Sequence, residues 1–276
     1  MLTEQYHRDG FYCPIGVMSE GRAAALRGEF ERCETFFKEH PEYGSMGAYP
    51  HFFMPWLDEL IRDEALLTPV RSLLGDDLLV WGVSFFIKEA RTTSYVSWHQ
   101  DLHYWGLDDV YETTAWIALS PASKASGCMR FVPGTHLTGD REHADSFAEG
   151  NLLSRGQALL VRVDESKAVD AELEPGQMSL HHGRTFHASN PNTTGERRIG
   201  VAIRYIPASI AQADGTRTMA SLVSGDDRYG HFLLAPRPNS FAAPADIARG
   251  REAEKLKESI LYQSAAQRGR RHHAAA

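Results

Sequence analysis

The period of the hydrophobic pattern changes near residue 77, and this change limits the folds open to the chain. Before it, apolar residues recur at three- and four-residue steps, as on the buried face of a helix. After it, short apolar or alternating runs are separated by Gly, Pro, Ser and Asp, which is typical of strands joined by turns. The runs cover residues 78–87, 113–119, 129–132, 158–163, 178–181 and 199–206. Helices followed by many short strands predict an α+β fold with a jelly-roll β core.

Two helical regions are predicted before the strands, and we expect them to brace one outer face of the sheet. Ser19 is a candidate N-cap for a helix that runs to about His40. Its apolar face would consist of Ala23, Leu26, Phe30, Cys33 and Phe37. A second region runs from Pro55 to Leu74 and stops at Gly75.

The length of 276 residues and the hydrophobic content of 42% suffice for one large domain with a sizeable buried core. We expect a single domain with a helical part at about 1–76, a jelly-roll (cupin-like, double-stranded β-helix) core at about 77–207 and a C-terminal extension at about 208–276. A charged helix is predicted in this extension at about 245–263. The polar segment 137–157 is either a lid over an active site or an ordinary surface excursion.

The net charge of −7 and the pI near 6.0 argue against nucleic acid and anionic membranes as partners, because both select clustered positive charge. The three cysteines have no paired spacing, which suits reduced thiols. The first residues do not resemble a signal peptide, and no apolar run is long enough to span a bilayer. We therefore expect a cytoplasmic protein that acts on small molecules; the oligomeric state stays open.

His99 and Asp101 are the first candidate metal ligands. In a β-strand, residues i and i+2 point to the same face, so this imidazole and this carboxylate can lie side by side. Two histidines and one carboxylate occupy three neighbouring positions around Fe(II) and leave the others open for a co-substrate and oxygen. The pattern therefore indicates an enzyme with a metal centre.

The third ligand must come from another strand, and three histidines qualify by spacing: His181, His182 and His187. Adjacent His181 and His182 would point to opposite faces of a strand, so one of them is expected to face inward. Spacing alone does not choose among the three.

Four segments, in order, resemble the phytanoyl-CoA dioxygenase family of Fe(II)/2-oxoglutarate oxygenases. They are residues 98–101, 116–120, 126–136 (with Pro133-Gly134-Thr135-His136) and 186–192, and the resemblance extends from about residue 80 to 206. The sequence departs from the family pattern at Ala188 and Asn190, where glycine is commoner. The resemblance implies that His187 is the third ligand, with Fe(II) bound by His99, Asp101 and His187 and with 2-oxoglutarate and O2 as co-substrates.

The resemblance also implies the residues that bind 2-oxoglutarate. Arg198 lies eleven residues beyond His187, as the family's arginine commonly does, and its guanidinium matches a carboxylate with two parallel hydrogen bonds. Trp116 and Ser189 would line the same pocket. Arg204 shares the face of Arg198 on an extended segment and is the reserve candidate, whereas Arg197 would point the other way.

The primary substrate is the least determined part. Tyr104 and Trp105 follow the ligand pair closely and are candidate walls of its pocket, although core packing explains them equally well. No cluster of basic residues stands out near the motifs; Lys88 and Arg91 are only two charges, and we expect both to be solvated. Without a basic cluster for CoA phosphates, a free small metabolite or a natural-product intermediate is favoured as substrate.

The reaction that these residues predict is hydroxylation of a C–H bond, with release of succinate and CO2. Related halogenases replace the carboxylate ligand with Gly or Ala, so the retained Asp101 favours hydroxylation over halogenation. Desaturation, cyclisation, epimerisation and endoperoxide formation stay open. Two other classes are alternatives: a non-catalytic metal-binding jelly-roll protein, and a zinc hydrolase, which would need a general base that no HExxH-type spacing supplies.

Overall fold

The computed structural model describes the backbone of residues 1–47 and 49–274, and the side chains of residues 1–47 and 49–260. Its β core consists of a seven-stranded sheet of order β1-β9-β4-β11-β2-β12-β13 and a four-stranded sheet of order β3-β10-β5-β8. Strands β6 and β7 form a separate pair. The strand pairs are antiparallel except for β12 with β13. The predicted α+β fold with a jelly-roll core is confirmed.

The strands are short apart from the two at the centre of the large sheet. Those two are β2 (Leu78–Lys88) and β11 (Arg198–Pro207). The others are β1 (Phe11–Gly16), β3 (Val96–His99), β4 (Thr113–Ala118), β5 (Met129–Phe131), β6 (His143–Asp145), β7 (Gln157–Leu159), β8 (Val169–Ala171), β9 (Gln177–His181), β10 (His187–Ser189), β12 (Met219–Ser224) and β13 (Leu233–Leu234).

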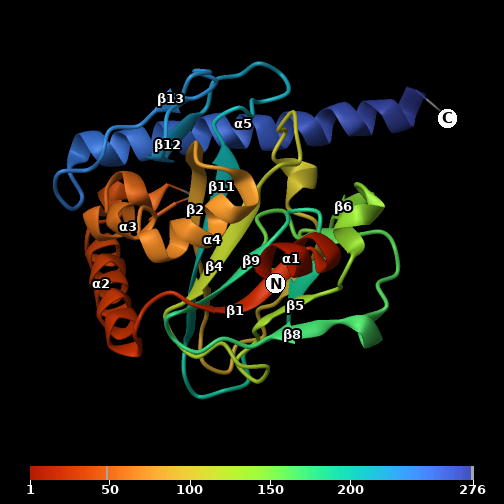
Figure 1. Ribbon diagram of the computed structural model, residues 1–276, viewed down its shortest axis with the longest axis horizontal. Helices are drawn as coiled ribbons and strands as arrows, with labels where there is room; N and C mark the ends of the chain where they lie inside the picture. Colours follow the sequence, from red (N-terminus) through yellow and green to blue (C-terminus); the bar gives the residue numbers. More distant parts are fainter. Residues whose placement is uncertain (48, 275–276) are drawn as a thin grey trace.

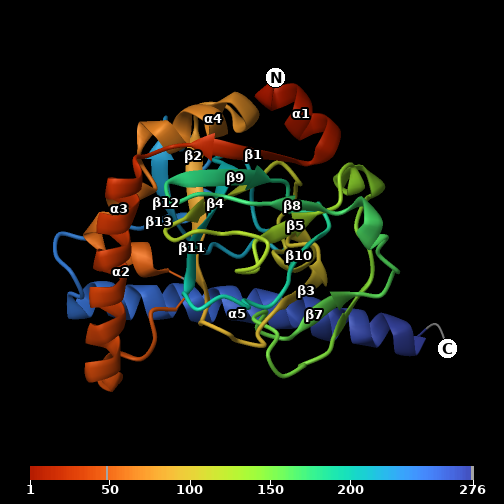
Figure 2. The ribbon, with the colours of Figure 1, turned by 90° about the horizontal axis from the view of Figure 1, so that it is seen from below.

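The helices before β2 gather at one side of the large sheet (Figures 1 and 2). They are α1 (Leu2–Asp9), α2 (Glu20–Glu39), α3 (Pro55–Leu60) and α4 (Glu64–Leu74). Ser19 caps α2, as predicted, and its hydroxyl accepts from the Arg22 amide at 3.2 Å. The second predicted region is divided in two because Asp63 starts a new helix, its carboxylate accepting from the Ala65 amide at 2.8 Å.

The two faces of β11 divide the core. Its odd-numbered residues from Ile199 to Tyr205 are fully buried in the cluster that packs the sheet against the helices. Its even-numbered residues from Arg198 to Arg204 face the four-stranded sheet, where Arg198, Ala202 and Arg204 line a cavity between the sheets. This alternation follows from the two-residue period of a strand, so the polar residues of the core lie between the sheets.

Part of the β core was not predicted. Strand β1 lies in the part expected to be helical, yet it pairs with β9, with Phe11 opposite His181. Phe11 stacks on Phe131 of the facing sheet at 4.6 Å between ring centroids, which ties β1 to the core. Strand β7 ends at Leu159, short of the predicted residue 163.

The C-terminal helix α5 (Pro244–Ala274) is longer than the predicted 245–263. It crosses one side of the molecule, from the end where α2 and α3 lie to beyond the sheets (Figures 1 and 2). In the part of the chain that the structure describes, no helix is long and apolar enough to cross a membrane.

Replacing Gly200 by alanine tests the contact between neighbouring strands at the centre of the large sheet. A Cβ atom there would lie 1.9 Å from the Trp116 ring, so the ring or the strand must move. We expect Gly200→Ala to lower the free energy of unfolding by about 1–3 kcal/mol in urea denaturation. Gly28→Ala in α2 is the control, because a Cβ there meets nothing within 4 Å. It should raise the free energy of unfolding by about 0.5–1 kcal/mol. Equal stability of the Gly200 variant and the wild type would contradict this packing.

Candidate metal centre

Strands β3 and β10 bring two histidines together. They pair antiparallel with His187 opposite His99, and the two ring centroids are 4.0 Å apart. Asp101 lies beyond the end of β3, with helical backbone angles at the start of a 3-10 turn (Leu102–Tyr104). The expectation that His99 and Asp101 share a strand face is therefore wrong, because the backbone turns after His99. The Asp101 carboxylate still returns to within 3.3 Å of His99 Nε2 and 3.9 Å of His187 Nε2.

Backbone carbonyls orient both imidazoles. His99 Nδ1 lies 2.9 Å from the Ser97 carbonyl and His187 Nδ1 lies 2.9 Å from the Thr185 carbonyl. A carbonyl only accepts, so Nδ1 is the donor in each ring and Nε2 carries the lone pair. Both lone pairs face the Asp101 carboxylate, and the ligand atoms of the three residues lie within 4.8 Å of one another. This donor set fits a divalent metal such as Fe(II).

The charge states of the group also suit a metal. Burial alone would raise the pKa of Asp101, but the imidazoles of His181, His99 and His187 hold it well below its usual range. Burial, helped by the neighbouring His99, lowers the pKa of His187 well below its usual value. The carboxylate is thus ionised and the His187 ring neutral near pH 7, which is the state that binds metal.

The other two candidate histidines lie on opposite sides, as predicted. His181 faces the cavity, with Nε2 3.9 Å from Asp101, and neither of its ring nitrogens has a hydrogen-bond partner among the described residues. His182 faces away, packs near His136 and accepts from the Arg184 amide at 3.0 Å. The group whose ligand atoms converge contains His187 rather than either neighbour.

A cavity of about 30 Å³ adjoins the three candidate ligands and is lined from both sheets, by Trp116, Ser189 and Arg198 among others. Arg198 is 1% exposed, and its guanidinium lies 5.1 Å from the centre of the Trp116 ring. Its Nη1 donates to the Gly127 carbonyl at 2.9 Å, and its Nε has no partner among the described residues. Burial lowers the pKa of Arg198 to about 10. The structure thus brings together all three residues that the sequence assigned to the co-substrate.

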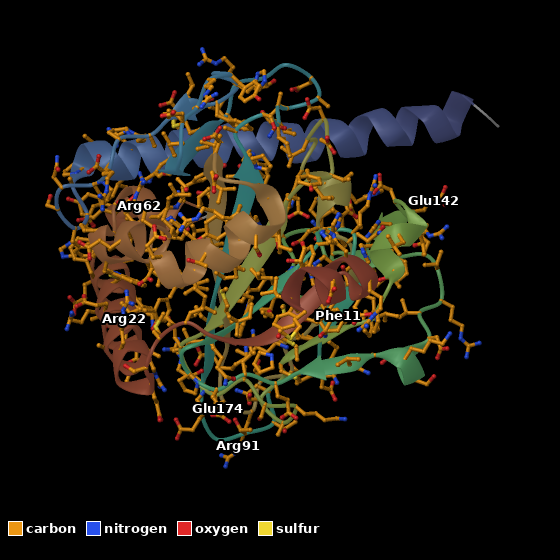
Figure 3. The ribbon with its side chains drawn as sticks, in the orientation of Figure 1. Phe11, Arg22, Arg62, Arg91, Glu142 and Glu174 are labelled. Atoms are coloured by element: carbon orange, nitrogen blue, oxygen red, sulfur yellow. The ribbon has the colours of Figure 1, made fainter. Side chains whose placement is uncertain are left out.

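Lys88 is a site residue that the sequence analysis missed, because the expectation that it is solvated is wrong. It is fully buried opposite Arg198 in the pairing of β2 with β11. Its Nζ donates to Ser189 Oγ at 2.7 Å and to the Asn190 carbonyl. Burial, with the nearby Arg198 charge, lowers its pKa to about 7. Arg91 is exposed at the edge of the molecule, as expected (Figure 3).

Arg197 and Arg204 also lie as the two-residue period predicts. Arg197 points away from the cavity and pairs with Glu34 at 2.8 Å and Glu89 at 2.9 Å. Arg204 lies on the side of Arg198, is 8% exposed and donates to Ser84 Oγ at 3.1 Å. Arg204 is thus close to the metal centre, whereas Arg198 is close to Lys88.

A larger cavity of about 480 Å³ is also lined by His99 and Asp101. Tyr104 and Trp105, the two candidate substrate residues, line it, and both are buried. Trp105 also packs on Trp81 at 5.1 Å between ring centroids, so it serves the core as well as the cavity wall. Residues of the segment 152–157 and of α5 complete the wall. The end of the polar segment 137–157 therefore borders the cavity.

Two facing sheets with a buried His-Asp-His group between them define the class of non-haem Fe(II)/2-oxoglutarate dioxygenases. The model of the family described as phytanoyl-CoA dioxygenase (PhyH) matches residues 6–200. The chain belongs to this family, as the resemblance indicated.

The relatives agree with this membership. A probable alpha-ketoglutarate-dependent hypophosphite dioxygenase of Stutzerimonas stutzeri is 28% identical over 203 residues, which cover 72% of this chain and 67% of the relative. An ectoine dioxygenase of Bordetella parapertussis is 26% identical over 282 residues, which cover 92% of this chain and 85% of the relative. Among solved structures, the non-heme monooxygenase ThoJ superposes with a TM-score of 0.85 at 32% identity, covering 97% of this chain and all of that one.

Exchanging histidines one at a time tests the candidate ligand set. We expect His187→Ala to weaken Fe(II) binding by more than about 100-fold, since it removes a coordinating nitrogen. His182→Ala should bind Fe(II) within a few-fold of the wild type, because its ring faces away from the group. Anaerobic competition with a chelator measures both affinities; the reverse order would show that the wrong histidine was chosen.

Proposed function

We propose that this chain is an Fe(II)- and 2-oxoglutarate-dependent oxygenase that hydroxylates a C–H bond of a small molecule. In this proposal His99, Asp101 and His187 hold the iron. The observation that supports it best is a pair of buried basic side chains without a carboxylate partner among the described residues: Arg198 lines the small cavity that the donor set also lines, and Lys88 lies beside it and donates to Ser189. A metal alone would not explain the cations.

A dicarboxylate co-substrate explains the two cations. Buried charges without a counter-ion destabilise a protein, and no carboxylate pairs with Lys88 or Arg198 among the described residues. The far carboxylate of 2-oxoglutarate would accept from Arg198, Lys88 and Ser189, while Trp116 would form the adjacent wall. The 2-oxo end would then lie toward His99 and Asp101. Arg204 is the less suitable partner for the far carboxylate because it lies beside the metal centre.

When bound, iron with 2-oxoglutarate and O2 supplies the oxidation of the C–H bond, with succinate and CO2 as co-products. The protein's residues orient and shield that chemistry. The Ser97 and Thr185 carbonyls hold the two imidazoles in the coordinating tautomer, and the buried walls exclude water. The retained Asp101 carboxylate favours hydroxylation over halogenation. Desaturation, cyclisation, epimerisation and endoperoxide formation are alternative outcomes of the same chemistry. We take the chain to be a single domain that acts in the cytoplasm.

A zinc hydrolase is disfavoured by the carboxyl groups around the centre. Such an enzyme needs an ionised general base beside the metal-bound water. Burial raises the pKa of Glu112 well above its usual range, and the nearby Asp101 charge adds to this. Its Oε1 already accepts from the Gly183 amide. Because burial disfavours its charged form, Glu112 is poorly suited to act as this base.

An anaerobic titration of the apo-protein with Fe(II) and 2-oxoglutarate tests the proposal directly. We expect the visible metal-to-ligand charge-transfer band of the chelate. Arg198→Ala should raise the Kd for 2-oxoglutarate by about 10- to 100-fold, since hydrogen bonds to charged groups contribute about 1.5–3 kcal/mol. Arg197→Ala, which removes an adjacent guanidinium on the other face, is the matched control and should leave the Kd unchanged. A protein that binds metal but shows no band would contradict the proposal.

The pH dependence of co-substrate binding tests Lys88. In the free site its pKa is about 7, so above this pH the amine is neutral. Binding a carboxylate favours the charged ammonium, hence binding above pH 7 takes up a proton and weakens by up to about tenfold per pH unit. The Kd for 2-oxoglutarate, measured from the charge-transfer band, should therefore rise between about pH 7 and 9 in the wild type. Lys88→Met should bind weakly with a flat profile; a flat wild-type profile would exclude this role.

A further inference from the structure

The larger cavity holds a lysine that the metal chemistry does not use. Lys257, on α5, is 8% exposed, and its side chain lines the cavity together with His99 and Asp101. Its Nζ lies 4.5 Å from the centre of the Trp81 ring and 5.7 Å from that of Tyr49. These rings hold the ammonium by cation–π attraction. Among the described residues, Lys257 has neither an ion pair nor a hydrogen bond.

Arg204 is the second cation on the same wall. Its guanidinium lies 5.6 Å from the centre of the Trp105 ring, and its Nε has no partner among the described residues. Burial lowers the pKa of Lys257 to about 7, and the positive charge of Arg204 lowers it further while Asp101 and Glu254 oppose the change. Both basic side chains line the same cavity, so an anion bound there would relieve the repulsion between their charges.

The carboxylates around the cavity do not neutralise this pair. Glu254 and Glu258 also line the cavity, but Glu258 is exposed at its edge and Glu254 turns toward Gly47, where its carboxylate occupies the space of a Cβ. Asp101 would be engaged by the metal. The cavity therefore has a positive inner wall near the metal centre and an acidic outer edge.

We propose that Lys257, together with Arg204, binds a carboxylate group of the primary substrate, so that α5 selects a small organic acid and orients its C–H bond toward the metal. This inference rests on the proposed function, because it takes the cavity that His99 and Asp101 share as the substrate site. It assigns α5 a role in substrate binding, together with Arg204 of β11.

The charges of the loaded site support an anionic substrate. A metal dication would be balanced by Asp101 and by the near carboxylate of the co-substrate, and the far carboxylate would lie between Lys88 and Arg198. Arg204 and Lys257 would then keep no counter-ion in a buried site. An aliphatic or neutral substrate would leave this cost in place, whereas a carboxylate would offset it and accept hydrogen bonds from both cations. The aromatic walls formed by Tyr104 and Trp105 would contact the rest of the molecule.

Matched acid and amide probes test the inference without turnover. The probes are benzoate and benzamide, phenylacetate and phenylacetamide, and hexanoate and hexanamide. They are titrated into protein loaded with Zn(II) and excess 2-oxoglutarate, so that the co-substrate site is closed to them, and binding is measured by saturation-transfer NMR. We expect at least one acid to bind about tenfold more tightly than its amide, since a charge-assisted hydrogen bond is worth about 1.5–3 kcal/mol.

Lys257→Met should abolish the preference for the acid and leave the Kd for 2-oxoglutarate unchanged. Lys255→Met is the matched control: Lys255 is exposed on the same helix, and its variant should keep the preference. If Lys257→Met does not fold, Lys257→Gln keeps the chain length and polarity and should show the same loss. Equal affinity for acid and amide in the wild type, failure of every acid to bind, or an acid preference that survives the Lys257 variants would each overturn the proposal.

The two proposals fail separately in these experiments. Absence of the charge-transfer band with Fe(II) contradicts the oxygenase function, while the acid preference is still measured on the Zn(II)-loaded protein. An intact band without any acid preference contradicts only the role of Lys257. Direct binding of the probes is the readout in either case, so no activity of the loaded enzyme is required.

Discussion

The pairing of β10 with β3 is the constraint on which the site depends. It places His187 opposite His99, although 87 residues separate them in the chain, and the antiparallel register leaves little freedom in their relative position. Asp101 then needs only a short turn after the strand to reach both rings. Because the carbonyls of Ser97 and Thr185 belong to the same two segments, the backbone that builds the pair also orients it. A one-residue slip of β10 would move His187 to the other face.

The long central strands extend this arrangement away from the metal. In β11, and in β2 beyond the bulge in their pairing, even-numbered residues lie on one side of the sheet, which is why Lys88 and Arg198 meet, while Phe85 and Ile199 pack toward the helices. Gly200 lies in the same row, and its missing side chain leaves room for the Trp116 ring. The proposed co-substrate pocket thus follows from strand periodicity, because polar residues take inward-facing positions that apolar core residues would otherwise fill.

Features set by a periodic or local sequence pattern were predicted, whereas features that depend on strand pairing between distant segments were missed. Helix α2 and its Ser19 cap, and the opposite directions of Arg197 and Arg198, follow from periods of 3.6 and 2. Strand β1 was missed because its partner, β9, lies far away in sequence. The burial of Lys88 was not predicted because its charge suggested solvent, and apolar residues occupy both faces of the strand before it, so the pattern offers no alternation to follow. The turn at Asp101 had no such local signal.

The candidate metal ligands and the substrate cavity draw on different parts of the chain, which explains why the chemistry is easier to recognise than the substrate. The family model ends at residue 200, so it covers the candidate ligands and Arg198 but stops before Arg204 and α5. The metal and the co-substrate impose the same geometry on every member of a family, so a short sequence motif with fixed spacing is enough to recognise it. A substrate pocket closed by a C-terminal helix is under no such common constraint. Lys257 is therefore brought to the candidate metal centre only by the fold of α5, and its charge, rather than its place in a motif, supports the proposed substrate class.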